Sequence, residues 1–203
     1  MIHRMRYINR WGLMRNTDAE NIQEHSLQVA VIAHALAEIR QLHYSENRPA
    51  VDKGDVLLFA IYHDASEILT GDLPTPVKYF NPMIRDAYHA VESVAVKKLV
   101  SLLPEELSSA WQQALDPDLH DESKQAAMQL VKAADRISAY IKCIDEEKAG
   151  NSEFRQAKLS IEKMLDDLAN ALPEVKYFRQ HFLPSFWLSL DDLQAIDKPS
   201  ENL

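Results

Sequence analysis

Apolar residues recur at helical spacing along most of the chain and are separated by short polar breaks. The segment Glu24 to Arg40 is almost entirely apolar from Leu27 to Ala37, which predicts a buried helix. Asn21, followed three residues later by Glu24, predicts a capping box at the start of this helix. A polar loop is expected from Ser45 to Gly54.

A second helix is predicted from about Asp55 to Leu69, because an apolar run opens it. Gly71 follows directly and predicts the end of the helix, since glycine is favoured just past a helix C-terminus. Pro74 and Pro76 come next, and their fixed φ angles predict a stiff loop.

The rest of the chain continues the helical pattern, with proline or glycine between segments. We expect a helix from Asn81-Pro82 toward Leu103, a shorter one opened by Pro104 and a long one from about Asp121 to Glu147. Gly150-Asn151-Ser152 breaks the long helix, and a further helix runs to about Leu172. Short helices are expected in the tail, which has Pro173, Pro184 and a Ser189/Asp192 capping pattern. No segment shows the alternation of a half-buried strand. The sequence therefore predicts an all-α fold, a single globular helical bundle over residues 1–203.

The composition supports one globular domain and excludes several functions. The chain has 203 residues, of which 46% are hydrophobic, enough for a sizeable core. Its four glycines form no Gly-rich phosphate loop. The net charge is −9, which disfavours a nucleic-acid polymer as partner. The acids are unevenly placed, because the first 16 residues hold four arginines and no acid.

Cysteine usage and apolar run length predict where the protein works. A single cysteine, Cys143, allows no intrachain disulfide and fits a reducing compartment. The longest uninterrupted apolar run, Val56 to Tyr62, is too short to span a membrane. The basic N-terminus lacks the apolar segment of a signal peptide. We therefore expect a cytoplasmic protein that does not bind membranes.

The strongest chemical feature is the pair His63-Asp64 in the second predicted helix, with Glu67 one turn later. These spacings place all three side chains on one side of a helix. Ionisable groups on the inner side of an apolar helix are costly unless they are paired or bind a metal. A satisfied polar cluster at the helix end is the alternative interpretation.

Two further residues extend this cluster. His25 shares a helical face with Val29, Ile32 and Leu36, and Asp135 shares one with apolar residues of the long helix. Taken alone, each fits an ordinary role, a hydrogen-bonded core histidine and a salt-bridged aspartate. Together, His25, His63, Asp64 and Asp135 supply the nitrogen and oxygen ligands that suit a divalent transition metal.

These residues resemble a known superfamily. The order His25, His63-Asp64, Asp135 is similar to that of the HD-domain metal-dependent phosphohydrolases. Almost the whole chain resembles the bacterial 5′-deoxynucleotidases within it, through Arg10-Trp11, Glu24-His25-Ser26, the run from His63 to Phe80, Ala134-Asp135, and the tail from Phe182 to Phe186. The resemblance implies an HD fold, a homodimer, a divalent metal, Co²⁺, Mn²⁺ or another, and removal of the 5′-phosphate from deoxyribonucleoside 5′-monophosphates. HD enzymes with two metals use additional histidines between the HD pair and the last aspartate, where this chain has His89 and His120. His120 lies in a polar loop and His89 on a mixed helix, so we expect one metal ion rather than two.

Each candidate residue then receives an expected role. His25, His63, Asp64 and Asp135 hold the metal, and Glu67 orients the attacking water or acts as general acid or base. Arg10 is expected to orient the phosphate, since a guanidinium meets phosphate in a fork. The resemblance implies that Trp11 selects deoxyribose by leaving no space for a 2′-hydroxyl. Asp72 would accept a hydrogen bond from the 3′-hydroxyl, and Leu73, Pro74 and Thr75 would fix the nucleoside.

Three of these residues also have a purely structural interpretation. Glu67 could be a hydrogen-bonded partner of His63, Arg10 an ordinary surface arginine and Trp11 a core side chain. Two other functions also remain open. An HD-type phosphohydrolase acting on another nucleotide or phosphomonoester would keep the metal ligands, but the Arg10-Trp11 pair argues against it. A helical binding module without catalysis would not need Glu67.

Overall fold

The computed structural model describes residues 1–78 and 80–195. Tyr79 of the family-like run and residues 196–203 of the predicted domain lie outside the described residues. The described α-helices, in chain order, are α1 (Ile22–Ile39), α2 (Lys53–Tyr62), α3 (Glu67–Thr70), α4 (Thr75–Lys78), α5 (Pro82–Val100), α6 (Glu105–Leu115), α7 (Glu122–Lys148), α8 (Arg155–Ala171), α9 (Pro173–His181) and α10 (Leu190–Ala195). Within these ranges the chain forms no strand, only one antiparallel bridge between Asn9 and Asn21, so the all-α prediction is confirmed.

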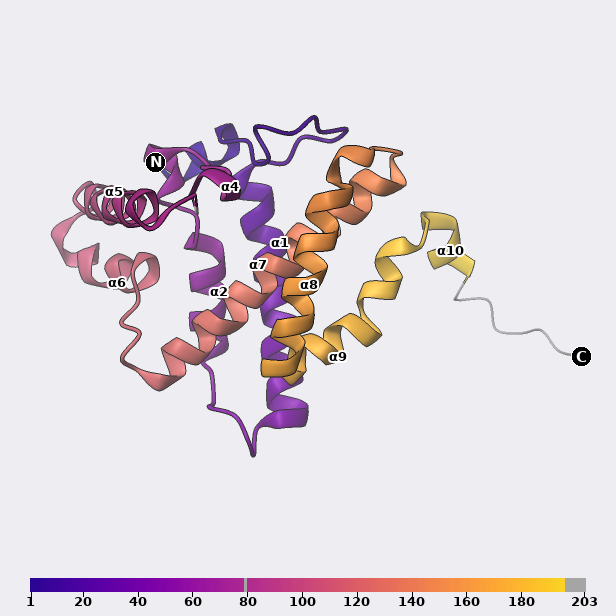
Figure 1. Cartoon of the computed structure of the whole chain (residues 1–203). Helices are drawn as coiled ribbons and strands as arrows, with labels where there is room; N and C mark the ends of the chain where they lie inside the picture. The colour runs from indigo at the N-terminus through magenta and orange to yellow at the C-terminus, as the bar shows by residue number, and fades with distance from the viewer. Residues whose placement is uncertain (79, 196–203) are drawn as a thin grey trace, which may run out of the picture.

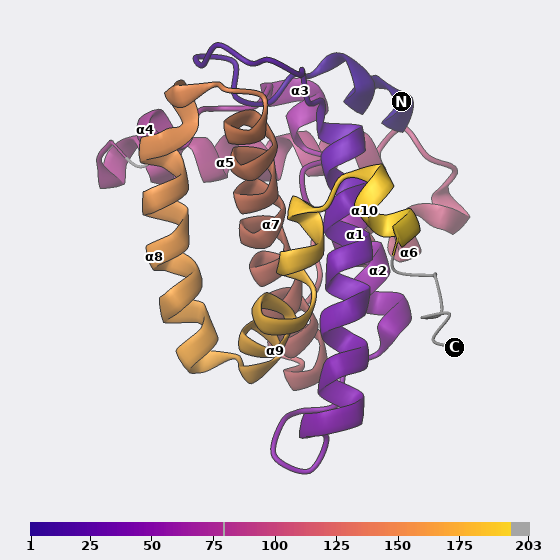
Figure 2. The same ribbon diagram turned by 90° about the vertical axis from the view of Figure 1, so that its right-hand side faces the viewer.

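The core lies where α1, α2 and α7 pack against one another, with α8 and α9 covering α7 and α1 (Figure 1). Fully buried residues such as Leu36, Leu130 and Ile137 fill it, and alanines on α1 and α7 let the two helices approach closely. Figure 2 shows the N-terminal segment crossing above the upper ends of α1 and α7. No helix in the described part of the chain is long and apolar enough to cross a bilayer.

The predicted caps are confirmed. The Asn21 side chain accepts hydrogen bonds from the backbone of Gln23 and Glu24, and Glu24 completes the capping box. Asn81 likewise caps α5, which has Pro82 at its first position. These caps matter for the site because α1 carries His25 in its first turn.

Several predicted boundaries shift. Helix α1 begins at Ile22 and continues into a π-helical turn at Arg40–Tyr44, and α2 begins at Lys53 because Asp52 caps it. Helix α5 ends at Val100 rather than at Leu103. Helix α6 begins after Pro104, which is its N-cap, and α7 matches its predicted range within one residue at each end.

The predicted continuous helix from Asp55 to Leu69 is wrong. Helix α2 ends at Tyr62, and residues 63–66 form tighter turns before α3 begins at Glu67. Hydrogen bonds between residues three apart mark these turns. For example, the Ala65 N–H donates to the Tyr62 carbonyl at 2.9 Å. The stiff loop predicted after Gly71 is also shorter than expected, because α4 already begins at Thr75.

Candidate metal centre

The folded chain brings three of the predicted ligands into one cluster. His25 comes from the first turn of α1, His63 follows α2, and Asp135 lies in the middle of α7. One ligand atom from each lies within 4.8 Å of the others. Asp64 borders this cluster, because its Oδ2 lies 3.1 Å from His63 Nε2 and 3.7 Å from His25 Nε2.

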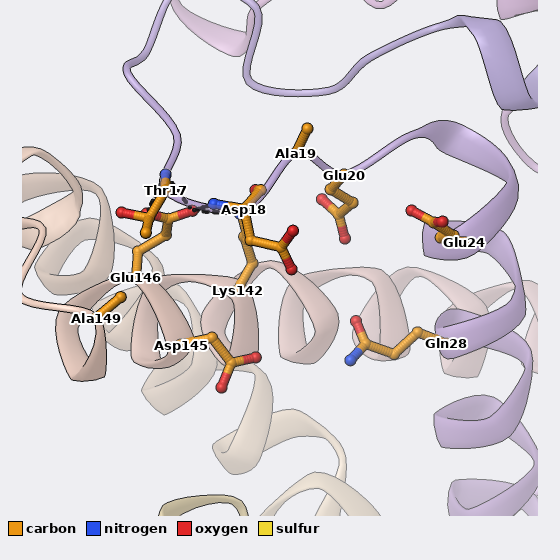
Figure 3. A pocket seen from close by; sticks show the side chains of 10 residues that line it. All are labelled: Thr17, Asp18, Ala19, Glu20, Glu24, Gln28, Lys142, Asp145, Glu146 and Ala149. Atoms are coloured by element: carbon orange, nitrogen blue, oxygen red, sulfur yellow. Dashed lines mark hydrogen bonds and ion pairs between the residues drawn. The ribbon is translucent and has the colours of Figure 1, made fainter.

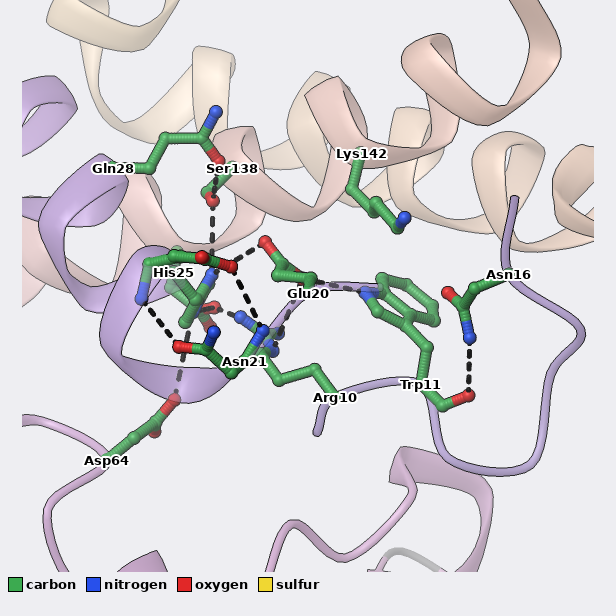
Figure 4. Close-up of polar contacts among 12 residues, drawn as sticks. Arg10, Trp11, Asn16, Glu20, Asn21, His25, Gln28, Asp64, Ser138 and Lys142 are labelled. Atoms are coloured by element: carbon green, nitrogen blue, oxygen red, sulfur yellow. Dashed lines mark hydrogen bonds and ion pairs between the residues drawn. The ribbon is translucent and has the colours of Figure 1, made fainter. Parts of the chain in front are cut away.

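Hydrogen bonds on the far side of each imidazole define which ring nitrogen faces the cluster. His63 Nδ1 donates to the Ala60 carbonyl at 2.8 Å. The Ser138 hydroxyl donates to Gln28 and therefore accepts from His25 Nδ1 at 3.1 Å (Figure 4). In the neutral form of each ring Nε2 therefore carries the lone pair, and both Nε2 atoms are buried without a hydrogen-bond partner.

The surroundings of these two lone pairs are negatively charged. His25 Nε2 lies 3.1 Å from Asp135 Oδ1. Burial lowers the pKa of His63, but the neighbouring Asp64 carboxylate raises this pKa by more, to about 9. Burial in turn raises the pKa of Asp64, but His63 outweighs this and lowers it to about 2. At neutral pH a proton on His63 therefore lies between the imidazole and the carboxylates, and the nitrogen and oxygen donors of the cluster also fit a divalent cation in its place.

Glu67 is the first residue of α3 and is only 9% exposed. Its Oε2 is buried and has no hydrogen-bond partner. Burial, together with the charges of Asp64 and Asp72, raises the pKa of Glu67 to about 10. A carboxyl group in this environment holds a proton at neutral pH and can donate it.

Arg10 is not a surface arginine. Its side chain is 14% exposed, with Nη2 3.9 Å from Asp135 Oδ1 and Nη1 buried without a partner. An unpaired guanidinium N–H beside the ligand cluster can bind an anion there. Trp11 is half-buried, and its ring lies 5.2 Å from that of Phe154.

The loop after α3 reaches the same region. Burial raises the pKa of Asp72, although the Arg10 charge and the Trp11 backbone partly offset this. Leu73 and Pro74 are half-buried, and Thr75 is exposed at the start of α4. Contacts of these three residues with a nucleoside remain predictions.

Helix α5 holds this loop in place. Tyr88 donates a hydrogen bond to the Gly71 carbonyl at 3.2 Å. Lys78 lies 4.5 Å above the Tyr88 ring and binds Glu92 at 2.9 Å. Gly71 itself has a φ of 73°, a conformation that glycine adopts without strain.

Sequence reasoning missed two residues that support the cluster. Ser138 could have been found, because it lies three residues after Asp135 on the same helix and therefore faces the same way. Glu20, which contacts Arg10, Trp11 and His25, lies outside every helix and has no periodic signal. His89 and His120, which lie between the HD pair and Asp135 in the sequence, are exposed and lie outside the cluster.

Comparisons with known proteins agree with this geometry. A family model described as 5′-deoxynucleotidase YfbR-like matches residues 1–186. A 5′-deoxynucleotidase of Cronobacter sakazakii is 49% identical over 198 residues, which cover 98% of this chain and 95% of that protein. A Listeria innocua HD-domain phosphohydrolase has a similar fold, with a TM-score of 0.77, 21% identity, and coverage of 95% of this chain and 89% of that one.

A second solved structure was determined with ligands in place. It is the cyanophage S-2L HD phosphohydrolase bound to dA and one catalytic Zn²⁺ ion, with a TM-score of 0.58, 19% identity, and coverage of 90% of this chain and 94% of that one. At these identities the two structures show the fold, and the sequence relatives show the family. The chain described here therefore belongs to the YfbR-like 5′-deoxynucleotidase family.

Proposed function

We propose that this protein is a metal-dependent 5′-deoxynucleotidase. It hydrolyses deoxyribonucleoside 5′-monophosphates to deoxyribonucleoside and phosphate and discriminates against ribonucleotides. The observation that carries the proposal is the grouping around Asp135 of three buried, unpartnered atoms: Nε2 of His25, Nε2 of His63, and Nη1 of Arg10. Two lone pairs for a cation and a free guanidinium N–H for an anion suit a phosphate monoester.

The cluster residues divide the work by their chemistry. His25, His63, Asp64 and Asp135 would hold a divalent cation, which when bound activates water and offsets phosphate charge. The fork of Arg10 binds and orients the phosphate from the side of Asp135. Glu67 holds a proton at its carboxyl group and donates it to the leaving 5′-oxygen.

The nucleoside would lie between the N-terminal segment and the loop after α3. The rigid indole of Trp11 would pack on the sugar and exclude a 2′-hydroxyl, and Asp72 would accept from the 3′-hydroxyl. Leu73, Pro74 and Thr75 would line the remaining wall, which needs little ordering because two prolines stiffen it. The family relationship supports this placement.

One assay set tests the proposal. Phosphate release is measured from dAMP and AMP, as purified, after chelation, and after adding back Co²⁺, Mn²⁺, Zn²⁺ or Mg²⁺. We expect faster hydrolysis of dAMP, loss of activity on chelation, and restoration by Co²⁺ or Mn²⁺. Equal rates on the two nucleotides would remove the sugar selectivity, and activity with another phosphomonoester alone would favour a different HD-type phosphohydrolase.

Three further properties belong to the same proposal. The enzyme is a homodimer, as its family relationship suggests, and light scattering coupled to size-exclusion chromatography would measure this. It works in the cytoplasm, which its single, buried Cys143 supports, and cell fractionation would test the location. It acts on mononucleotides rather than nucleic-acid polymers because its net charge is −9.

A further inference from the structure

Glu20 links three residues that have separate roles in the proposed function. Its Oε2 accepts a hydrogen bond from Trp11 Nε1 at 3.1 Å and lies 3.8 Å from Arg10 Nε. Its Oε1 lies 3.7 Å from His25 Nδ1, on the side of the imidazole that faces away from the cluster (Figure 4). One carboxylate therefore contacts the proposed sugar-selecting residue, the phosphate-binding residue and a ligand.

The backbone fixes Glu20 in this position. The Arg10 N–H donates to the Glu20 carbonyl at 2.8 Å, and the Ile22 N–H donates to the Ile8 carbonyl at 3.0 Å. These bonds flank the bridge between Asn9 and Asn21 and pair the N-terminal segment with the entry to α1. The side chain, which is 13% exposed, therefore points at its partners from a rigid base.

Trp11 depends on such a partner because its backbone is strained. Its φ is 58°, in the left-handed region that bulky residues avoid because it strains the backbone. The surroundings must therefore hold it. Asn16 donates to the Trp11 carbonyl at 3.3 Å, Phe154 packs against the ring, and Glu20 binds the indole N–H.

The same carboxylate also borders a cavity of about 300 Å³ between residues 17–20 and the helices α1 and α7 (Figure 3). Several acidic residues line it, among them Asp18, Glu24, Asp145 and Glu146. Asp145 is exposed, on the α7 side of the cavity. It provides a matched control, because its substitution removes the same charge from the same cavity.

We propose that Glu20 is a positioning residue that sets sugar discrimination by holding the Trp11 indole and that orients Arg10 toward the phosphate. The inference rests on the proposed function. The acceptor atom matters for Trp11 and the negative charge matters for Arg10, so the two effects are separable. Glu20→Gln keeps an acceptor and removes the charge, whereas Glu20→Ala removes both.

The kinetic test compares kcat and KM for dAMP and AMP in the full-length, metal-loaded wild type, E20A, E20Q and D145N. For E20A we expect the dAMP/AMP ratio of kcat/KM to fall about tenfold, with a raised KM for dAMP and unchanged metal content. E20Q should keep this ratio within about twofold but raise KM, and D145N should match the wild type. A merely structural role would slow both nucleotides equally, so an unchanged ratio in E20A would overturn the proposal.

A second variant covers the case in which E20A does not fold. Trp11→Phe removes the same hydrogen bond from the other partner and should lower the ratio to a similar extent. A wild-type ratio in W11F, or a ratio in E20Q as low as in W11F, would contradict the role of the acceptor. If E20A folds, the double variant W11F/E20A should have a dAMP/AMP ratio of kcat/KM no lower than that of either single variant, because both substitutions remove the same hydrogen bond.

A spectroscopic readout does not depend on the nucleotidase activity. The Trp11 indole N–H gives one of three tryptophan side-chain signals in a ¹⁵N–¹H spectrum, identified by its absence in W11F. This signal should shift in E20A, shift less in E20Q and stay in place in D145N. If the wild type hydrolysed no deoxynucleotide, the proposed function would fail, but this spectrum would still test the hydrogen bond between Glu20 and Trp11. An unmoved signal in E20A would refute that hydrogen bond.

Discussion

The orientation of two imidazole rings determines what the centre can bind. Each ring uses Nδ1 as a donor, to Ala60 or to Ser138, so each presents an Nε2 lone pair toward carboxylates. Lone pairs facing carboxylates repel unless positive charge lies between them. The backbone carbonyl and the serine hydroxyl therefore direct both Nε2 atoms toward the carboxylates, where a proton or a metal cation supplies the positive charge.

Glu67 offers a sharp test of proton transfer. Because its pKa is raised to about 10, glutamine closely replaces its protonated form. We expect Glu67→Gln to keep the melting temperature and the metal content while lowering kcat by about 10²–10⁴. Phosphate release, metal analysis and thermal unfolding measure the three quantities. A variant that lost its metal would instead place Glu67 among the ligands.

Trp11 allows a test of steric selection. Trp11→Ala removes the ring that is proposed to exclude a 2′-hydroxyl, so AMP hydrolysis should gain on dAMP hydrolysis by about tenfold or more, equivalent to about 1.4 kcal/mol. Substituting the exposed Trp187 by alanine serves as a control and should leave the ratio unchanged. Steady-state kinetics on both nucleotides give the answer, and an unaltered dAMP/AMP ratio in W11A would disprove steric selection.

At the scale of elements, the N-terminal segment is tied to the last turns of α7 by a buried carboxylate. Glu146 is 1% exposed, accepts from the backbone N–H of Thr17 at 2.9 Å and from Asn151 at 2.7 Å, and pairs with Lys142. Burial raises its pKa, but these partners outweigh burial and lower it to about 2. The segment that carries Arg10 and Trp11 therefore depends on this charge.

The stability of this tie should depend on pH. An acid with a lowered folded-state pKa stabilises the fold above its unfolded pKa and loses that contribution as pH falls through the folded value. Glu146→Gln should thus lower the free energy of unfolding by about 3 kcal/mol at pH 7 and by much less near pH 2. Urea unfolding of both proteins from pH 7 to pH 2 measures the difference.

The adjacent Asp145 is the control for this prediction, because its pKa is shifted in the opposite direction. Burial raises it more than Lys148 and Lys142 lower it. Asp145→Asn should therefore leave stability at pH 7 unchanged or slightly higher. An E146Q variant whose deficit stayed constant across the whole pH range would show that packing, not charge, holds the segment.

Short-range sequence signals predicted most helices and their caps. They could not predict contacts between residues that are far apart in the sequence. Asn21 and Asn81 act within four residues of themselves, so the sequence alone identifies them. No proline or glycine marks the end of α2 at Tyr62, so the sequence gives no local signal for it. The residues that follow it, Ala65 and Ile68, are buried, and their packing is a tertiary effect. The contacts of Glu20 depend on the Asn9–Asn21 bridge, and no periodic pattern encodes it.

On the scale of the whole molecule, the centre lies between two apolar clusters of unequal size. The larger one runs through α1, α2, α7, α8 and α9. The smaller one includes Ala65 and Ile68, which alternate along the chain with His63, Asp64 and Glu67. Two of the predicted ligands thus come from helices of the large core, and the small cluster holds the turn that carries the other two.

At the other end of α1, a buried ion pair tests whether the chain unfolds as one domain, which remains a prediction. Arg40 is 2% exposed and pairs with the fully buried Glu174 of α9, so removing Arg40 leaves an uncompensated charge. Arg40→Ala should lower the free energy of unfolding by about 3–5 kcal/mol, and the double variant Arg40→Met/Glu174→Leu should recover much of it.

The Arg40 variants should leave the site itself intact. Arg40 follows His25 by 15 residues, roughly 22 Å at 1.5 Å per helical residue, so the dAMP/AMP ratio should not change. In a single domain, circular dichroism and tryptophan fluorescence should report one coincident urea transition that moves to lower concentration in R40A. Two separated transitions, with only one of them shifted, would instead show that α9 and its neighbours unfold independently of the metal centre.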